Sequence, residues 1–186
     1  MDIAAELAAS LGFPTPAYTG VERERRWLCA AVPRGIELRT ERITDLYVTG
    51  ARLRLREARP LSGAPAILRL SRKADVDAST RLVTSIYLPE HEFEILSNSL
   101  AGRRICKLRH RLPREEGIGL MVDEFLGEHE GLVLAEAEFK SAGRMSAFAM
   151  PAFAVREITG DPRFTGAALA ELGLPSNLSD LVAGRG

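Results

Sequence analysis

From Gly20 onward, short segments of the chain alternate apolar and polar residues with a period of two, and Gly, Pro and Asp residues separate these segments. Successive side chains of a strand point to opposite faces, so the alternation is typical of β-sheets. The pattern predicts strands over residues 20–31, 41–48, 51–58, 66–74, 80–88, 103–111, 119–126 and 131–139. Many antiparallel strands with few helices indicate a barrel or a sandwich.

Helical patterns are few and lie mostly near the ends of the chain. They predict helices over residues 1–12, 89–98 and 163–172. We expect residues 1–19 to be an N-terminal appendage and linker, because two prolines fall in 13–19. Residues 20–172 would form one barrel domain. Residues 173–186, rich in Gly, Pro, Ser and Asn, would be a flexible tail.

On several strands the charged side chains share one face and the opposite face is apolar, as in Leu53, Arg54, Leu55 and Arg56. Two arrangements fit this pattern. Either the charges face water over an apolar core, or they line the lumen of a closed barrel. The number of charges on each such face favours the barrel. Trp27 and the apolar outer faces then need cover, from helices or from a second copy of the chain in a homodimer.

Composition narrows the class of protein. The chain has 186 residues, 46% of them hydrophobic, with 25 basic and 25 acidic side chains. These numbers fit one folded domain and give none of the basic excess of a general nucleic-acid binder. The N-terminus lacks the pattern of a secretory signal, and no apolar run reaches the roughly 20 residues that span a membrane. We therefore expect a cytoplasmic protein without membrane contact, in which Cys29 and Cys106 are free thiols outside any zinc-binding spacing.

Two pairs of glutamates suggest a metal site. Glu22 and Glu24 share one strand face with Arg26, and Glu136 and Glu138 share another. Like charges side by side repel, and a divalent cation with a preference for oxygen ligands would relieve that repulsion. Two such pairs on separate strands could converge on one metal ion.

Basic side chains recur on the same kind of face. They are Arg52, Arg54 and Arg56 on one strand, Arg69 and Lys73 on the next, Arg81 on a third, and Arg103, Lys107 and Arg109 on a fourth. The planar guanidinium fork binds two phosphate oxygens at once. Any single charged face is more often solvated surface, and an all-β domain with charges facing water is the simpler alternative. Together the faces suggest a receptor for a metal-loaded polyanion.

The same runs resemble, in order, a known family. VERERRWL is similar to the ExExK signature of CYTH domains, also called triphosphate tunnel metalloenzymes. Further strands of that family, and its C-terminal stretch, are similar to ARLRLRE, LSRK, RRICKLRHRL, MVDEF, LAEAEF and REITGDPRFTGAALA of this chain. The similarity spans residues 20–172.

The resemblance implies a mainly β fold, a closed eight-stranded antiparallel barrel with a few flanking helices and a charged tunnel. It implies that Mg²⁺ or Mn²⁺ is bound by Glu22, Glu24, Glu136 and Glu138. It implies phosphate binding by Arg54, Arg56, Lys73, Lys107 and Arg109, and we expect Arg81 to join them. Arg26 takes the place of the signature lysine, and Asp123 matches an acidic tunnel position from which it would orient the attacking water.

The sequence departs from the family pattern in three places. Arg26 replaces lysine, so a proton-carrying role is lost. Val83 and Ser85 stand where two glutamates are usual, which removes two metal or water ligands. Gly166 stands where asparagine is common.

We expect metal-dependent hydrolysis of a triphosphate-containing small molecule, with inorganic triphosphate as the leading substrate. The alternatives are a non-catalytic polyphosphate or nucleotide-binding module, which the missing glutamates favour, a thiamine triphosphatase, and a class IV-type adenylate cyclase.

Overall fold

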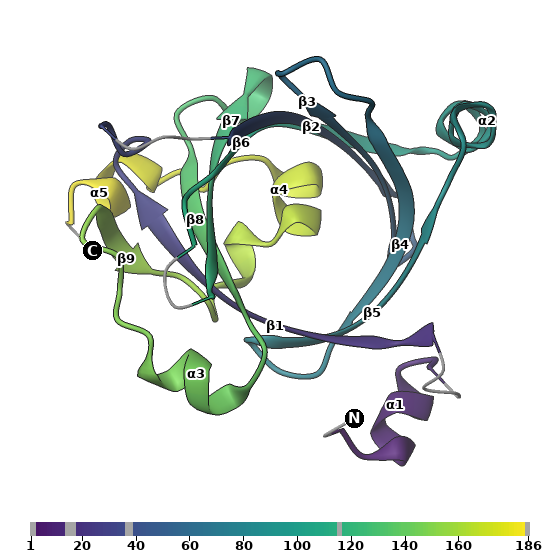
Figure 1. Ribbon diagram of the computed structural model, residues 1–186, viewed down its shortest axis with the longest axis horizontal. Helices are drawn as coiled ribbons and strands as arrows, with labels where there is room; N and C mark the ends of the chain where they lie inside the picture. Colours follow the sequence, from purple (N-terminus) through teal and green to yellow (C-terminus); the bar gives the residue numbers. More distant parts are fainter. Residues whose placement is uncertain (1–2, 14–17, 36–38, 115–116, 185–186) are drawn as a thin grey trace.

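A computed structural model describes residues 3–13, 18–35, 39–114 and 117–184 (Figure 1). Its main feature is a sheet of strands that closes on itself. The strands are β1 (Gly20–Cys29), β2 (Arg39–Val48), β3 (Leu53–Pro60), β4 (Ile67–Asp75), β5 (Thr80–Tyr87), β6 (Gly102–Arg111), β7 (Gly119–Leu126), β8 (Val133–Phe139) and β9 (Ala154–Glu157). The first eight lie within two residues of the predicted strands, whereas β9 was not predicted.

The sheet runs in the order β5-β4-β3-β2-β6-β7-β8-β1-β9, and an additional pairing of β5 with β1 closes it. Each pairing is antiparallel, so the fold is the expected closed eight-stranded antiparallel barrel with β9 added beside β1. β1 closes the barrel by pairing with β5 through residues 20–23 and with β8 through residues 23–29. Closure leaves the eight barrel strands no free edge and gives the sheet an inner and an outer face.

Short helices lie around and across the barrel (Figure 1). They are α1 (Ala5–Ser10), α2 (Glu90–Ser99), η2 (Gly127–His129), α3 (Ala142–Ala147), η3 (Pro162–Phe164), α4 (Gly166–Leu172) and α5 (Leu178–Val182). The helix predicted over 163–172 is divided into η3 and α4, because the Thr165 side chain caps a new helix by accepting from the Ala168 amide. Residues 1–2 of the first predicted helix and 14–17 of the linker lie outside the described residues.

The outer face of the barrel is covered within the chain where β1 meets β8. Trp27 is fully buried, and its ring lies 5.7 Å from that of Phe148, just after α3. On another side of the barrel, Phe13 follows α1 and is buried against Ala74 and Leu82. The cover that Trp27 requires thus comes from α3 and its following loop.

The inner face becomes apolar at one end, where α4 lies across the lumen (Figure 1). Leu169 of α4 is buried against Ile105, Phe125 and Leu134 of the barrel. Leu181 of α5 is buried in the same cluster, so part of the segment expected to be a flexible tail packs on the core instead. This cluster forms the apolar end of the lumen. Within the described ranges, no helix is long and apolar enough to cross a membrane.

Candidate active site in the barrel lumen

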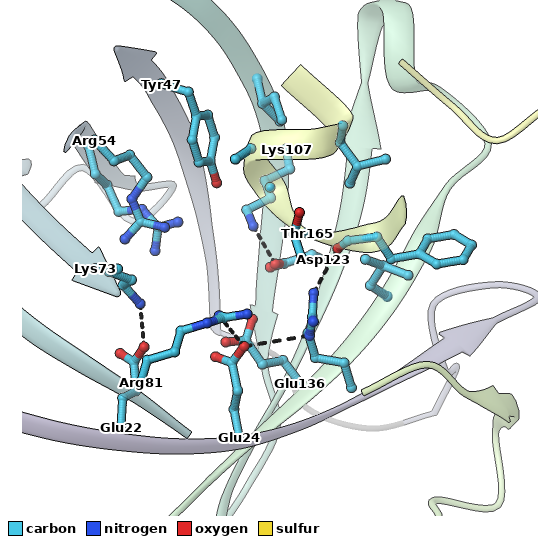
Figure 2. A pocket seen from close by; sticks show the side chains of 18 of the residues that line it. Glu22, Glu24, Tyr47, Arg54, Lys73, Arg81, Lys107, Asp123, Glu136 and Thr165 are labelled. Atoms are coloured by element: carbon cyan, nitrogen blue, oxygen red, sulfur yellow. Dashed lines mark hydrogen bonds and ion pairs between the residues drawn. The ribbon is translucent and has the colours of Figure 1, made fainter. Parts of the chain in front are cut away.

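A cavity of about 310 Å³ occupies the lumen beside α4 (Figure 2). All twelve side chains that the sequence singles out as metal-binding, phosphate-binding or catalytic line it. Its charged lining consists of the cations Arg26, Arg52, Arg54, Arg56, Arg69, Lys73, Arg81, Lys107 and Arg109 and the acids Glu22, Glu24, Asp75, Asp123, Glu136 and Glu138. Arg103, which shares a strand with Lys107, is exposed and does not line the cavity. The charged strand faces therefore point inward, and cations outnumber acids.

The two glutamate pairs lie side by side because β1 and β8 are antiparallel neighbours. Glu24 is the register partner of Glu138, and Arg26 is the partner of Glu136. Glu22 forms an ion pair with Lys73 of β4 (Figure 2). Acids from β1 and β8 thus meet on one wall of the lumen.

Crowding of these acids changes their protonation. Burial, the charge of Glu136 and a hydrogen bond to Glu136 raise the pKa of Glu24 to about 8, although Arg81 forms an ion pair with it. Burial would also raise the pKa of Glu136, but Arg109 and the hydrogen bond from Glu24 hold it well below its usual value. The opposite shifts of the two pKa values favour a proton on Glu24 that is hydrogen-bonded to Glu136.

The chemistry of this wall fits a divalent cation. The donors are carboxylate oxygens, which hard cations prefer, and a cation could replace the proton held between Glu24 and Glu136. Burial and the nearby charges of Glu136 and Glu22 also raise the pKa of Glu138. In their present positions, however, the described His, Cys, Asp and Glu side chains form no group of three or more that could hold a metal ion. Binding a metal would require Glu22 and Glu24 to leave Lys73 and Arg81.

On the opposite wall, Asp45 holds two arginines that the sequence assigned to phosphate. Arg56 donates to both of its oxygens, at 2.7 and 2.6 Å, and Nε of Arg54 lies 3.5 Å from it. Burial would raise the pKa of Asp45, but the charges of Arg56 and Arg54 outweigh it and hold the pKa far below its usual value. Two nitrogens of Arg54, Nε and Nη2, are buried without a hydrogen-bond partner in the described part of the chain.

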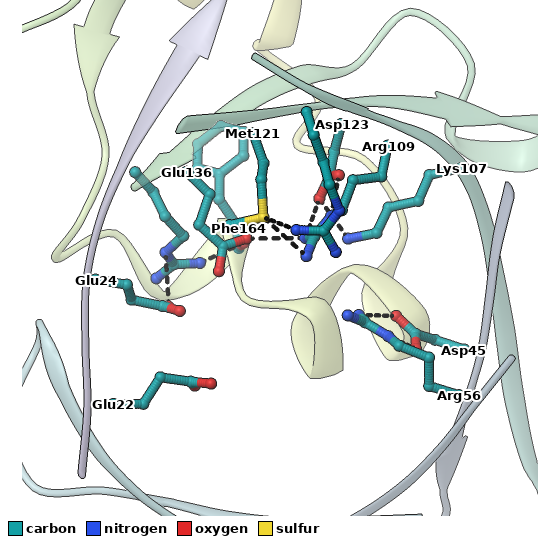
Figure 3. A network of polar contacts seen from close by, with 12 residues as sticks. Glu22, Glu24, Asp45, Arg56, Lys107, Arg109, Met121, Asp123, Glu136 and Phe164 are labelled. Atoms are coloured by element: carbon teal, nitrogen blue, oxygen red, sulfur yellow. Dashed lines mark hydrogen bonds and ion pairs between the residues drawn. The ribbon is translucent and has the colours of Figure 1, made fainter. Parts of the chain in front are cut away.

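A second such cluster lies between β6 and β7 (Figure 3). Nζ of Lys107 lies 2.6 Å from Asp123, and Arg109 donates to both Asp123 oxygens at 2.7 Å. Arg109 also reaches Glu136 at 3.1 Å, so it joins the basic wall to the acidic wall. Both oxygens of Asp123 are engaged, and Arg109 and Lys107 keep its pKa low in spite of burial. These contacts are those of a residue that positions cations, and its role in orienting water stays a prediction.

Arg26 contacts the segment that carries α4. It donates to the Phe164 carbonyl at 2.7 Å and to the Thr159 carbonyl at 3.2 Å, and its Nε lies 3.5 Å from Glu24. This arrangement fixes the start of α4 against β1. A catalytic role for Arg26 remains a prediction.

The sequence interpretation missed Tyr47 and Thr165 as lining residues, and it missed Asp45 as the buried acid that holds Arg54 and Arg56. Asp45 and Tyr47 are two positions apart on β2, so they share one face of the strand. This alternation was the sequence signal that could have identified both. A Cβ on Gly166 would lie 1.8 Å from the Tyr47 hydroxyl oxygen, so Tyr47 fills the space that a side chain at position 166 would need. No local sequence signal could reveal that contact.

A closed antiparallel barrel whose lumen joins carboxylates to an excess of guanidinium and ammonium groups defines a tunnel-type, polyanion-binding class of protein. No family model matches the sequence. An inorganic triphosphatase of Acetivibrio thermocellus is 45% identical to this chain over 78 residues. The matched segment is 42% of this chain and about half (48%) of that relative. An inorganic triphosphatase of Nitrosomonas europaea is 31% identical over 153 residues, 80% of this chain and 96% of the relative.

A solved structure supports the same grouping. The crystal structure of an inorganic triphosphatase has a TM-score of 0.55 and 29% identity, and the alignment covers 80% of this chain and 93% of that one. The chain belongs to the family of these inorganic triphosphatases.

Proposed function

We propose that the protein hydrolyses inorganic triphosphate in the lumen of the barrel. Membership of a family whose named relatives are inorganic triphosphatases supports this reaction. The single observation in the molecule that carries the proposal is the excess of cations around the cavity, among them Arg54 with two buried nitrogens that lack a hydrogen-bond partner in the described part of the chain. A buried donor without a partner is costly, and an anionic oxygen would satisfy it.

The cofactor we propose is Mg²⁺ or Mn²⁺, held by Glu22, Glu24, Glu136 and Glu138. When bound, the ion would neutralise phosphate charge and polarise the bridging oxygens. Lys73, released from Glu22, and Nη1 of Arg81, released from Glu24, could then contact phosphate, while Nε of Arg81 remains bonded to Asp75. Lys73 and Arg81 would thus become part of the phosphate site.

The basic residues supply positioning and electrostatic stabilisation. Asp45 fixes Arg54 and Arg56, and Asp123 fixes Lys107 and Arg109, so their donors need little reorganisation when substrate binds. Such fixed donors stabilise the charge that develops on the transferred phosphoryl group and the leaving phosphate. Water would attack the terminal phosphorus in line.

One observation favours the binding module as a second candidate. Val83 and Ser85 line the lumen side of β5 but provide no carboxylate, so a water or a second metal has fewer ligands there. A protein of this kind would bind triphosphate tightly and release little phosphate under either metal.

The test is phosphate release from tripolyphosphate with Mg²⁺ or Mn²⁺, for the native protein and for Glu22→Gln/Glu24→Gln. We expect metal-dependent release that falls at least about a hundredfold in the double variant. The matched control is Glu92→Gln/Glu94→Gln on the exposed face of α2, which should retain full activity. Triphosphate binding by calorimetry without release under either metal would instead support the binding module. Equal activity of both double variants would contradict the site.

A further inference from the structure

The N-terminal segment, residues 3–13, lies on the outside of the barrel and contributes no side chain to the lining of the lumen cavity (Figure 1). Its helix α1 ends in a Schellman motif: the Gly12 amide donates to the Ala9 carbonyl at 2.9 Å, and the Phe13 amide donates to the Ala8 carbonyl at 2.8 Å. Gly12 has a φ of +81°, the left-handed conformation that this motif requires and that glycine adopts without strain. The motif therefore fixes Phe13 beside Ala8, and both side chains are buried.

The cluster formed by Phe13 and Ala8 lies on the outer face of three barrel strands. It contains Ala74 of β4 and Leu82 of β5, and Val21 of β1 packs against it. Leu82 is the register partner of both Val21 and Ala74, so the three residues form one row across the sheet. The N-terminal segment thus covers a row that crosses β4, β5 and β1.

Polar contacts fix the segment on this face. The Arg72 guanidinium of β4 lies 4.6 Å from the centre of the Phe13 ring, and its Nη2 donates to the Leu11 carbonyl at 2.9 Å. A cation over an aromatic ring and a charged hydrogen-bond donor are both favourable contacts. The Thr84 hydroxyl of β5 donates to the Tyr18 carbonyl at 3.0 Å, so the chain contacts β5 again just before β1 begins.

The covered row includes the junction where the barrel closes, which is its shortest strand pairing. β1 and β5 pair through residues 20–23 and 80–83, four register pairs, whereas β1 pairs with β8 through seven and β2 with β6 through ten. The other barrel pairings have six or seven. A pairing with fewer backbone hydrogen bonds opens locally at a lower free-energy cost. The β1–β5 junction is therefore the place where the barrel opens most easily.

The lumen side of the same junction carries part of the proposed metal and phosphate site. Successive side chains of a strand point to opposite faces, so the chain neighbours of the covered row point inward. Among these neighbours are Glu22, Lys73 and Arg81, which line the cavity. Lys73 contacts Glu22 and Arg81 contacts Glu24, so both ion pairs join β1 to the strands across the junction (Figure 2). Opening of the junction would separate the β1 carboxylates from these cations.

We propose that Phe13 is a positioning residue that holds the β1–β5 junction closed from the outside and thereby sets the geometry of the acidic wall. The inference rests on the proposed function for its effect on catalysis, because it takes Glu22 and Glu24 to bind metal and Lys73 and Arg81 to bind phosphate. Phe13 acts through the strands that it covers and touches neither substrate nor metal.

The test compares Phe13→Ala with Leu7→Ala, a matched control on α1 whose side chain is exposed. The conservative variant Phe13→Leu keeps part of the buried apolar contact and replaces the alanine variant if that one does not fold. Hydrogen–deuterium exchange without metal or phosphate reports opening of the junction independently of catalysis. Phosphate release from tripolyphosphate over a range of Mn²⁺ concentrations reports the geometry of the site.

We expect Phe13→Ala to speed amide exchange in residues 20–23 and 80–83 at least about tenfold and to leave residues 105–109 of β6 within about twofold of the native rate. The Mn²⁺ concentration for half-maximal release should rise roughly tenfold. Phe13→Leu should lie between Phe13→Ala and the native protein in both measurements, and Leu7→Ala should match the native protein.

A residue with a merely structural role would give a different result. Exchange that is unchanged or uniformly faster in Phe13→Ala would overturn the proposal, and so would a native Mn²⁺ dependence in the folded variant. If the native protein releases no phosphate from tripolyphosphate, the proposed function is refuted, and exchange at the β1–β5 junction still decides whether Phe13 holds it closed.

Discussion

The contact between Gly166 and Tyr47 gives a prediction that joins the start of α4 to the lumen wall. An alanine at position 166 would place its Cβ 1.8 Å from the Tyr47 hydroxyl oxygen and 2.5 Å from Cζ of the ring. Both distances are far below van der Waals contact, so the ring or the helix has to move. Tyr47 is half-buried and packs against the core cluster that holds α4, so the movement disturbs neighbours.

The magnitude follows from two opposing effects. Overpacking of a filled site costs about 1–3 kcal/mol. Alanine is the better helix former, which offsets up to roughly 1 kcal/mol of this cost. We expect Gly166→Ala to lower the free energy of unfolding by about 1–2 kcal/mol, measured by urea denaturation.

A double-mutant cycle isolates the clash. In a Tyr47→Ala background the obstructing ring is gone, and Gly166→Ala should be neutral or slightly stabilising, which gives a coupling energy of about 2 kcal/mol. Gly143 of α3 serves as the control, because a Cβ there meets no atom within 4 Å. Gly143→Ala should therefore not destabilise the protein. If Gly166→Ala lowers the free energy of unfolding by the same amount in the Tyr47→Ala background, the clash is not the cause and the reasoning is refuted.

Two further predictions concern ion pairs. Asp45→Asn leaves Arg56 buried without its counter-charge and should lower the free energy of unfolding by about 3–5 kcal/mol in urea denaturation, and a change below about 1 kcal/mol would contradict the buried pair. The hydrogen bond from Arg25 lowers the pKa of Glu157 below its ordinary value of 4.5. Ionised Glu157 therefore stabilises the fold above pH 4.5, and this stabilisation is lost as the pH falls through the lowered pKa. The stability difference between native protein and Glu157→Gln should shrink on acidification, and a constant difference from pH 7 to strong acid would contradict the assignment.

Strand positions followed from the sequence because alternation is a local property of the chain. The same alternation placed Glu22, Glu24, Arg54 and Arg56 on charged faces before their surroundings were known. β9 was missed because its four residues, Ala154–Glu157, are too few to show a period. α5 was missed because its five residues follow a segment rich in Gly, Pro and Ser, and tertiary burial of Leu181 holds it in place.

The sequence alone determined the type and order of the barrel strands and which side chains share a face, because these depend on neighbours along the chain. It did not determine what those side chains meet across the lumen. The antiparallel register of β1 and β8 decided that Glu24 lies against Glu136 and Glu138. The register of the β2–β3 hairpin decided that Asp45 holds Arg54 and Arg56. Packing of α4 against Tyr47 decided which end of the lumen is filled. Apart from the β2–β3 hairpin, these contacts join residues far apart in sequence, and only the closed three-dimensional fold brings those residues together.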